Sequence, residues 1–251
     1  MREPIFPKTS VECYAGLHWK MNTLYSQEIL LFVRLRPYNS YMTEKIENIP
    51  PEFFLREDET DDENFYEQPR LVTHIDDPAC AALNDYFRKK LPENGELLDL
   101  MSSCVSHLPY DLSYKRVVGL GMNQVELNEN PQLTNSIVQN LSNNPILPFA
   151  DHSFDGCMIT VSVQYLVKPL KLFSEIGRIL RPEANCIVSF SNRCFPTKAI
   201  SLWHQLSNEG HGKLVMYYFN NSRKFKEPEF NNISPNPGKT DPLFVVTAST
   251  K

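Results

Sequence analysis

The sequence lacks three features that would each assign a protein to a functional class. A membrane-spanning helix needs about 20 apolar residues, but the longest apolar run near the N-terminus covers only residues 29–33 (ILLFV), so no membrane partner is predicted. No C-x-x-C pair is present, which argues against a finger-type zinc site, and no metal ligand set is predicted. The G-x-G-x-x-G turn is also missing, which disfavours a dinucleotide-dependent dehydrogenase.

Clustered positive charge is the next absence. The formal net charge is −5 and no stretch gathers Lys and Arg, whereas binding to duplex nucleic acid requires many phosphate contacts. We therefore predict no nucleic-acid partner. With 251 residues and 41% apolar residues, the chain has the size and composition of one ordinary domain plus an extension, and we expect a monomer or homodimer.

The cysteines indicate a reducing environment. Of the six cysteines, Cys157 and Cys186 lie inside apolar runs, where a cysteine behaves as a small buried hydrophobe. A chain of this length can build a core without disulfides, so we expect a cytoplasmic protein. The first residues lack the pattern of a secretory signal, while import into an organelle stays open because Ser, Thr and basic residues are scattered there.

The chain divides near residue 68. Residues 1–68 are interpreted as an irregular N-terminal extension with several prolines and one expected helix over residues 22–36. The acidic run at residues 56–63 (REDETDDE) is typical of a solvated loop, with a partner-binding segment as the lesser alternative. Residues 69–94 are predicted to contain a helix with Asp77 as its N-cap and Pro78 in its first turn.

From residue 96 onward, apolar strands alternate with helices. Strands are expected over residues 97–100, 116–120, 156–163 and 185–190, with helices from residue 123 and over residues 169–180. Strands that are apolar on both faces indicate an α/β fold with a mostly parallel central sheet and helices on both faces. A long helical stretch over residues 195–219 and a final strand over residues 242–248 predict an antiparallel C-terminal edge.

Five ordered segments make the pattern specific: residues 96–103 (ELLDLMSS), 117–123 (VVGLGMN), 147–155 (LPFADHSFD), 173–182 (FSEIGRILRP) and 189–193 (SFSNR). In order and spacing they resemble the class I S-adenosylmethionine-dependent methyltransferases, most closely the type-11 group. The resemblance covers roughly residues 70–251. It implies a Rossmann-like fold over residues 69–251, S-adenosylmethionine as cofactor, and methyl transfer, which we expect to act on a small-molecule substrate.

The resemblance also implies where the cofactor would bind. The loop after the first strand would hold its methionine part through Asp99, Met101, Ser102 and Ser103, where the family has glycines in a turn that opens a helix. Alternatively, Asp99 only ties the turn or caps a helix. The family places a ribose-binding carboxylate where this chain has Gly121, so Met122, Asn123 and Glu126 become the candidates. For Asn123 and Glu126, helix capping is the competing interpretation.

The remaining candidates lie before and within the strand expected over residues 156–163 or shortly after it. The resemblance implies that an amide near residues 140–144 accepts from the adenine amino group. Asn140 and Asn143 are equally placed for this role, with Leu141 between them and an Asn-rich turn as the alternative. Val163 would contact the cofactor, and Gln164 and Tyr165 would lie beside the transferring methyl group, with Tyr165 as a catalytic or packing residue.

Three further residues complete the expected site. Asn192 and Arg193 are expected to face the substrate, with Arg193 either binding an acidic group or forming a surface ion pair. His107 is the candidate general base, with capping or packing as the alternative. Two functions therefore compete: a methyltransferase, and a non-catalytic protein of the same fold that serves as an interaction scaffold.

Overall fold

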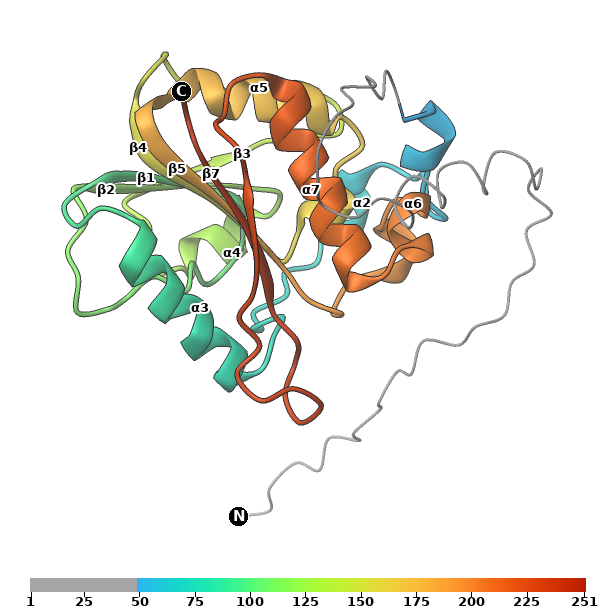
Figure 1. Ribbon diagram of the computed structural model, residues 1–251, viewed down its shortest axis with the longest axis horizontal. Helices are drawn as coiled ribbons and strands as arrows, with labels where there is room; N and C mark the ends of the chain where they lie inside the picture. Colours follow the sequence, from blue (N-terminus) through green and yellow to red (C-terminus); the bar gives the residue numbers. More distant parts are fainter. Residues whose placement is uncertain (1–48) are drawn as a thin grey trace, which may run out of the picture. The chain divides into compact units, whose positions relative to one another are not determined.

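The computed structural model describes residues 49–251, and the helix expected over residues 22–36 lies outside the described residues. Within them, strands form one seven-stranded sheet in the order β3-β2-β1-β4-β5-β7-β6 (Figure 1). The strands are β1 (Glu96–Ser102), β2 (Arg116–Gly121), β3 (Asn135–Val138), β4 (Phe154–Thr160), β5 (Leu180–Phe190), β6 (Glu229–Asn232) and β7 (Phe244–Ser249).

The sheet has the predicted mixed character. β1 pairs in parallel with β2 and β4, β2 with β3, and β4 with β5. β7 runs antiparallel to both β5 and β6, which confirms the antiparallel C-terminal edge. β3 was missed in the sequence because it is a short strand at the sheet edge whose residues are all exposed or half-buried. The predicted small-hydrophobe role of Cys157 and Cys186 is confirmed, since both are fully buried on neighbouring strands.

Helices cover both faces of the sheet, as predicted (Figure 1). The helical elements are η1 (Pro51–Phe54), α2 (Asp62–Phe65), α3 (Asp77–Lys90), α4 (Gln124–Asn128), η2 (Val163–Tyr165), α5 (Pro169–Ile179), η3 (Pro196–Lys198), α6 (Ser201–Gln205) and α7 (Asn208–Ser222). None of the helices between residues 49 and 251 is both long enough and apolar enough to cross a membrane.

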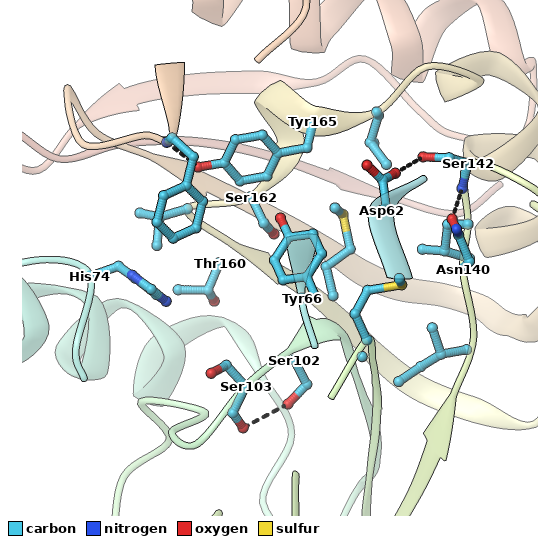
Figure 2. A pocket seen from close by; sticks show the side chains of 18 of the residues that line it. Asp62, Tyr66, His74, Ser102, Ser103, Asn140, Ser142, Thr160, Ser162 and Tyr165 are labelled. Carbon is cyan, nitrogen blue, oxygen red and sulfur yellow. Dashed lines mark hydrogen bonds between the residues drawn. The ribbon is translucent and has the colours of Figure 1, made fainter. Parts of the chain in front are cut away.

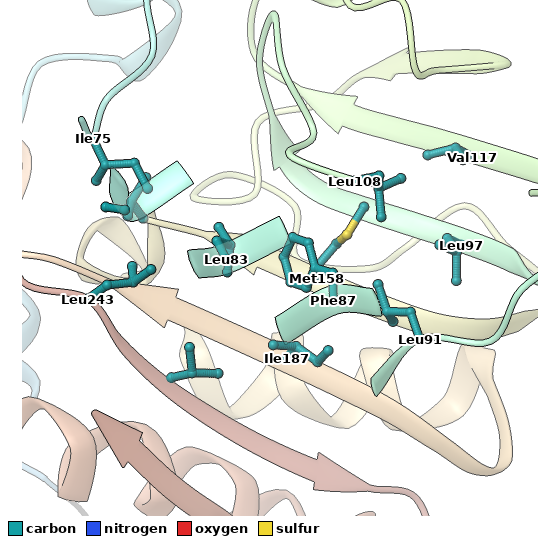
Figure 3. Close-up of a cluster of buried hydrophobic side chains, with 13 residues drawn as sticks. Ile75, Leu83, Phe87, Leu91, Leu97, Leu108, Val117, Met158, Ile187 and Leu243 are labelled. Carbon is teal, nitrogen blue, oxygen red and sulfur yellow. The ribbon is translucent and has the colours of Figure 1, made fainter. Parts of the chain in front are cut away.

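The α3 helix builds the core on one face of the sheet. Leu83 and Phe87 lie one turn apart on α3 and pack with Leu97, Met158 and Ile187 from three strands (Figure 3). Burying each such side chain contributes roughly 1.5–3 kcal/mol, so this cluster anchors the helix to the sheet. The opposite face is covered by α5 and α7, which contact each other and strands β5 and β7.

Two helix predictions were wrong in detail. The N-cap of α3 is Asp76, whose side chain accepts a hydrogen bond from Ala79 N, because Pro78 occupies the second helical position rather than the first. The single helix expected over residues 195–219 is divided into η3, α6 and α7. Leu206 takes an extended conformation, and the Ser207 hydroxyl then caps α7 by accepting from Gly210 N.

The connection between β1 and β2 is the main departure from the expected pattern. Residues 103–115 contain no helix, although the resemblance implied that a turn after β1 opens one. β1 instead continues to Ser102, which pairs with Gly121 across a register shift. The β1–β2 connection therefore supplies no helix N-terminus at the carboxyl end of β1.

Residues 49–74 lie across the carboxyl edge of the sheet and belong to the same compact unit as residues 75–251. We call residues 56–74 the strap. The expectation of a solvated acidic loop holds for most of its acidic residues, but Asp62 is buried and binds Arg56 through both carboxylate oxygens. Lys198 is also buried and lies 3.2 Å from both Asp58 and Asp62, so this ion cluster fastens the strap to the loop after β5.

Candidate cofactor and active site

A cavity opens at the carboxyl ends of β1, β2 and β4, beneath the strap (Figure 2). Parallel α/β sheets bind their ligands at this edge, where the strand order reverses. Of the residues predicted from sequence, Asp99, Met101, Ser102, Ser103, His107, Gly121, Met122, Asn140, Leu141, Tyr165 and Arg193 line the cavity. The cavity lining does not include Asn123, Asn143, Val163, Gln164 or Asn192.

Asp99 lies at the floor of the cavity and is nearly inaccessible to solvent. Its Oδ2 atom accepts hydrogen bonds of 2.6 Å from the hydroxyls of Ser102 and Ser106. Burial raises the pKa of this carboxyl to about 6, although the two hydroxyls act in the opposite direction. Asp99 thus organises the loop after β1, which is the alternative role weighed from sequence, while also reaching the cavity.

Strained backbone borders the cavity at the ends of β1 and β4. Met101 has φ of 61°, a left-handed conformation that costs a non-glycine residue about 1–2 kcal/mol. Val161 has φ of 42°, which is rarer still for a β-branched residue. The chain thus retains a glycine-like turn without glycine, and strained residues of this kind often border functional sites.

The carboxyl end of β2 has no room for the carboxylate of the family pattern. A Cβ atom at Gly121 would lie 2.2 Å from Ser102 O, so only glycine fits beside the continued β1 strand. Glu126 reaches the cavity from α4 instead. Its oxygens accept from Arg70 N and from the Ser103 hydroxyl, both at 2.7 Å.

Asn123 is a cap rather than a cavity residue. Its Oδ1 accepts from the backbone of Val125 and Glu126, and its Nδ2 donates to Tyr66 O and Glu67 O on the strap. Both ends of the amide are therefore occupied by protein groups. These contacts correspond to the capping alternative, and Asn123 is not part of the cavity lining.

The loop after β3 supplies the far end of the cavity. Asn140 and Leu141 line it, whereas Asn143 faces a neighbouring surface depression, which separates the two amides that the sequence could not rank. The strap holds this loop in place: Asn140 donates to Asp61, and the hydroxyl of Ser142 donates to Asp62 at 2.7 Å (Figure 2).

Some of the residues after β4 and β5 line the cavity, and others lie outside it. Gln164 is buried outside the cavity, where its amide donates to Val161 O, and Val163 is likewise buried. Tyr165 lines the cavity, but its hydroxyl accepts a 2.8 Å hydrogen bond from Phe195 N, and burial raises its pKa. Arg193 forms an ion pair with Asp241 at 2.9 Å, the alternative weighed from sequence, and Asn192 is exposed beside it.

Sequence reasoning missed the part of the site that the strap contributes. Arg56, Asp62, Tyr66 and His74 line the cavity although they precede every family motif. Their only sequence signal was the density of charged and aromatic residues around the acidic run. In the part of the chain that the structure describes, no three His, Cys, Asp or Glu side chains gather as a metal site.

Two cavity hydroxyls lack a protein partner. Thr160 Oγ1 and Ser162 Oγ are buried without a hydrogen bond to any described residue, and Figure 2 shows both near the centre of the cavity. Leaving a buried polar group unsatisfied costs about 1–3 kcal/mol, so such groups usually meet water or a ligand. These hydroxyls can therefore meet water or a polar ligand in the cavity.

Comparison with known proteins agrees with this geometry. Residues 98–188 match the family model described as a methyltransferase domain, and they contain most of β1 and all of β2, β3, β4 and α5, with the cavity residues between them. Residues 98–188 are therefore similar to a methyltransferase domain. The solved structures that share its fold include SAM-dependent methyltransferases, whose cofactor is S-adenosylmethionine.

Solved structures share the fold of the methyltransferase domain at low sequence identity. A SAM-dependent methyltransferase from Aquifex aeolicus is 17% identical with a TM-score of 0.51, over 81% of this chain and 100% of its own. One from Thermotoga maritima is 16% identical with a TM-score of 0.51, over 69% and 90%. A biotin biosynthesis bifunctional protein from Teredinibacter turnerae is 56% identical over 36 residues, which span 14% of this chain and only 6% of that protein.

The residues present fit this cofactor, with one difference. At one end of the cavity, the amide and backbone groups of residues 139–142 can form hydrogen bonds with a nucleoside. The unpartnered hydroxyls of Thr160 and Ser162 lie toward the middle of the cavity. At the β1 end, the hydroxyls of Ser102 and Ser103 replace the helix N-terminus that would otherwise attract the cofactor's carboxylate.

Proposed function

We propose that this chain is an S-adenosylmethionine-dependent methyltransferase that acts on a small-molecule acceptor. The observation that carries the proposal is the strapped cavity at the carboxyl ends of β1, β2 and β4, with the buried, unpartnered hydroxyls of Thr160 and Ser162 inside it. A cavity closed over by the chain itself favours a small molecule over a macromolecule.

In this proposal the cofactor lies along the sheet edge. Met101, Ser102 and Ser103 hold its methionine part, and the rim formed by Gly121, Met122 and Glu126 holds the ribose. Asn140 and Leu141 face the adenine. The cofactor supplies an electrophilic methyl group on its sulfonium, so the protein contributes mainly proximity and orientation.

In this proposal, a histidine accepts the proton that the methyl acceptor releases. His74 and His107 are the two histidines that line the cavity, and burial lowers the pKa of both. Both are therefore neutral at pH 7 and can accept a proton. Tyr165 serves as a wall, because its hydroxyl is already bonded and its raised pKa makes it a poor base.

The scaffold alternative has one observation in its favour. The β1–β2 connection lacks a helix, and Gly121 cannot carry the family's ribose carboxylate. If these differences abolish cofactor binding, the domain would serve as a non-catalytic interaction scaffold. A direct binding measurement separates the two functions.

The test is calorimetric titration of the full chain with S-adenosylmethionine and S-adenosylhomocysteine. We expect saturable micromolar binding, weakened about 2- to 10-fold by Ser162→Ala and by Thr160→Val, since a net hydrogen bond contributes about 0.5–1.5 kcal/mol. Ser189→Ala is the matched control, because its hydroxyl is also buried and unpartnered but lies outside the cavity. Failure of the folded chain to bind either compound would refute the proposal and favour the scaffold.

A further inference from the structure

The cavity has an aromatic side that none of the sequence motifs includes. Tyr66, His74, Tyr165 and Phe195, here called the aromatic wall, bound it beside the end of β4 (Figure 2). Building on the proposed function, we infer that the aromatic wall is the acceptor subsite, that it takes an uncharged aromatic compound with a phenolic hydroxyl, and that His74 accepts the hydroxyl proton.

Phe195 is the centre of the aromatic wall. Its ring stacks against Tyr165 with centroids 5.9 Å apart and an interplanar angle of 24°. His74 and Tyr66 meet the same ring edge-on, at 5.7 Å and 6.5 Å. Flat apolar surfaces in this arrangement favour a planar ring as the ligand, because aromatic groups pack in stacked or edge-to-face geometries.

The ligand must also carry a polar group. Ser162 is buried at 8% exposure, and its hydroxyl and that of Thr160 have no partner among the described residues. Figure 2 shows them between the aromatic wall and the β1 loop. A purely apolar ring would leave both hydroxyls unsatisfied, whereas a ring with a hydroxyl can meet them.

The charge behind the aromatic wall disfavours a cationic acceptor. The Arg70 guanidinium lies 4.5 Å from the ring centroid of Phe65, 5.1 Å from that of Phe195 and 5.7 Å from that of Tyr66. Its hydrogen bonds go to the carbonyls of Phe65 and Gln68, and no carboxylate of the described residues forms an ion pair with it. The rings therefore already face one cation, the Arg70 guanidinium, and the sulfonium of the cofactor is a second. Both positive charges would stabilise the negative charge that develops on a phenolic oxygen.

His74 is better placed than His107 to receive the proton. Its ring contacts Phe195 directly, so it belongs to the aromatic wall, whereas His107 follows the β1 loop. Burial and Arg70 lower the pKa of His74, while Glu126 raises it. Burial lowers the pKa of His107 to about 4, and an imidazole with so low a pKa is a weak base at pH 7.

The proposed step is balanced in atoms and charge. A lone pair of the phenolic oxygen forms a bond to the methyl carbon while the carbon–sulfur bond breaks and its electron pair goes to sulfur. The sulfonium becomes a neutral thioether, and the phenolic proton moves to the neutral imidazole of His74. The products are an aryl methyl ether, S-adenosylhomocysteine and an imidazolium that returns its proton to solvent.

The first test measures the charge preference of the subsite. Full-length protein saturated with S-adenosylhomocysteine is titrated with 4-ethylphenol, 4-ethylanisole, tyramine and 4-hydroxyphenylacetate. We expect 4-ethylphenol to bind at least five-fold more tightly than the other three. Tyramine binding equally or more tightly, or no binding of 4-ethylphenol to protein that binds S-adenosylhomocysteine, would overturn the inference alone. Failure to bind S-adenosylhomocysteine would refute the proposed function as well.

The second test follows conversion of 4-ethylphenol into 4-ethylanisole by chromatography. His74→Gln should lower kcat about 10²- to 10⁴-fold with little change in KM, and should abolish the loss of activity seen as pH falls below the pKa of His74. His107→Gln should cost less than ten-fold. His152→Gln is the control, because His152 is exposed outside the cavity. A larger loss of kcat in His107→Gln, or an unchanged pH profile in His74→Gln, contradicts the role of His74.

Discussion

Replacing Lys198 by Met tests whether the buried ion cluster holds the strap on the domain. The Lys198 ammonium is buried, lies 3.2 Å from carboxylate oxygens of Asp58 and Asp62, and donates to Thr60 O at 2.7 Å. Met keeps most of the apolar stem but removes the charge. The variant therefore leaves two carboxylates and a carbonyl without their shared donor.

The expected loss follows from what each partner retains. Removing one member of a buried ion pair costs about 3–5 kcal/mol. Asp62 keeps its two hydrogen bonds from Arg56, and the Asp58 side chain is 26% exposed and keeps those from Thr60. We therefore expect the low end, about 3 kcal/mol. With a urea slope of about 2 kcal/mol per M, the unfolding midpoint falls by about 1.5 M.

The assay is urea denaturation followed by circular dichroism at pH 7. Lys226→Met is the matched control, because its ion pair with Glu183 is exposed, and its free energy of unfolding should change by less than about 0.5 kcal/mol. The double variant Lys198→Met with Asp62→Asn should show a coupling of at least about 1 kcal/mol. A loss below about 1 kcal/mol for Lys198→Met, or equal losses in both lysine variants, would refute the reasoning.

Three further outcomes are expected in the same denaturation assay. Gly121→Asp should destabilise the fold by more than about 2 kcal/mol, because its Cβ would lie 2.2 Å from Ser102 O; an unchanged midpoint would contradict that crowding. Met101→Gly should preserve or raise the free energy of unfolding, since its φ of 61° suits glycine, whereas Met101→Val should lower it. The Asp99 pKa rises from 3.8 unfolded to about 6 folded, so the folded state binds the extra proton, and stability falls as pH rises from about 4 to 6. In Asp99→Asn, the fall in the free energy of unfolding over this pH range should be smaller by about 3 kcal/mol. A pH profile identical to that of the unsubstituted protein would show that Asp99 is not the source.

Most of the sheet could be predicted because its strands carry their own signal. β1, β2, β4, β7 and the second half of β5 are mostly apolar and buried, and such runs separated by a helix-length segment indicate a parallel sheet. β3 carries no such signal, since it is a four-residue edge strand without a buried residue. The division of the predicted helix after residue 195 depends on a Ser207 cap that competes with continuous helical periodicity.

The residues of the candidate site also divide into those that could be predicted from the sequence and those that could not. Asp99, Met101 and Asn140 were found because they lie at fixed offsets from recognisable strands, and the structure brings all three to one cavity. Asn123 and Gln164 instead bond to nearby backbone groups outside the cavity lining, which an offset along the chain does not reveal. Tyr66 and His74 could not be predicted as site residues, because they lie in an irregular segment that has no recognisable strand or motif.

The sequence by itself determined the strand pattern, the family resemblance and the end of the sheet where a ligand binds, because these follow from apolar periodicity and short-range order. Only the tertiary structure decided how that end is closed. The strap crosses from residue 56 to residue 74 and is tied down by Lys198 on the loop after β5, far away in the chain. Contacts between such distant segments depend on burial and charge pairing in three dimensions, which no local pattern encodes.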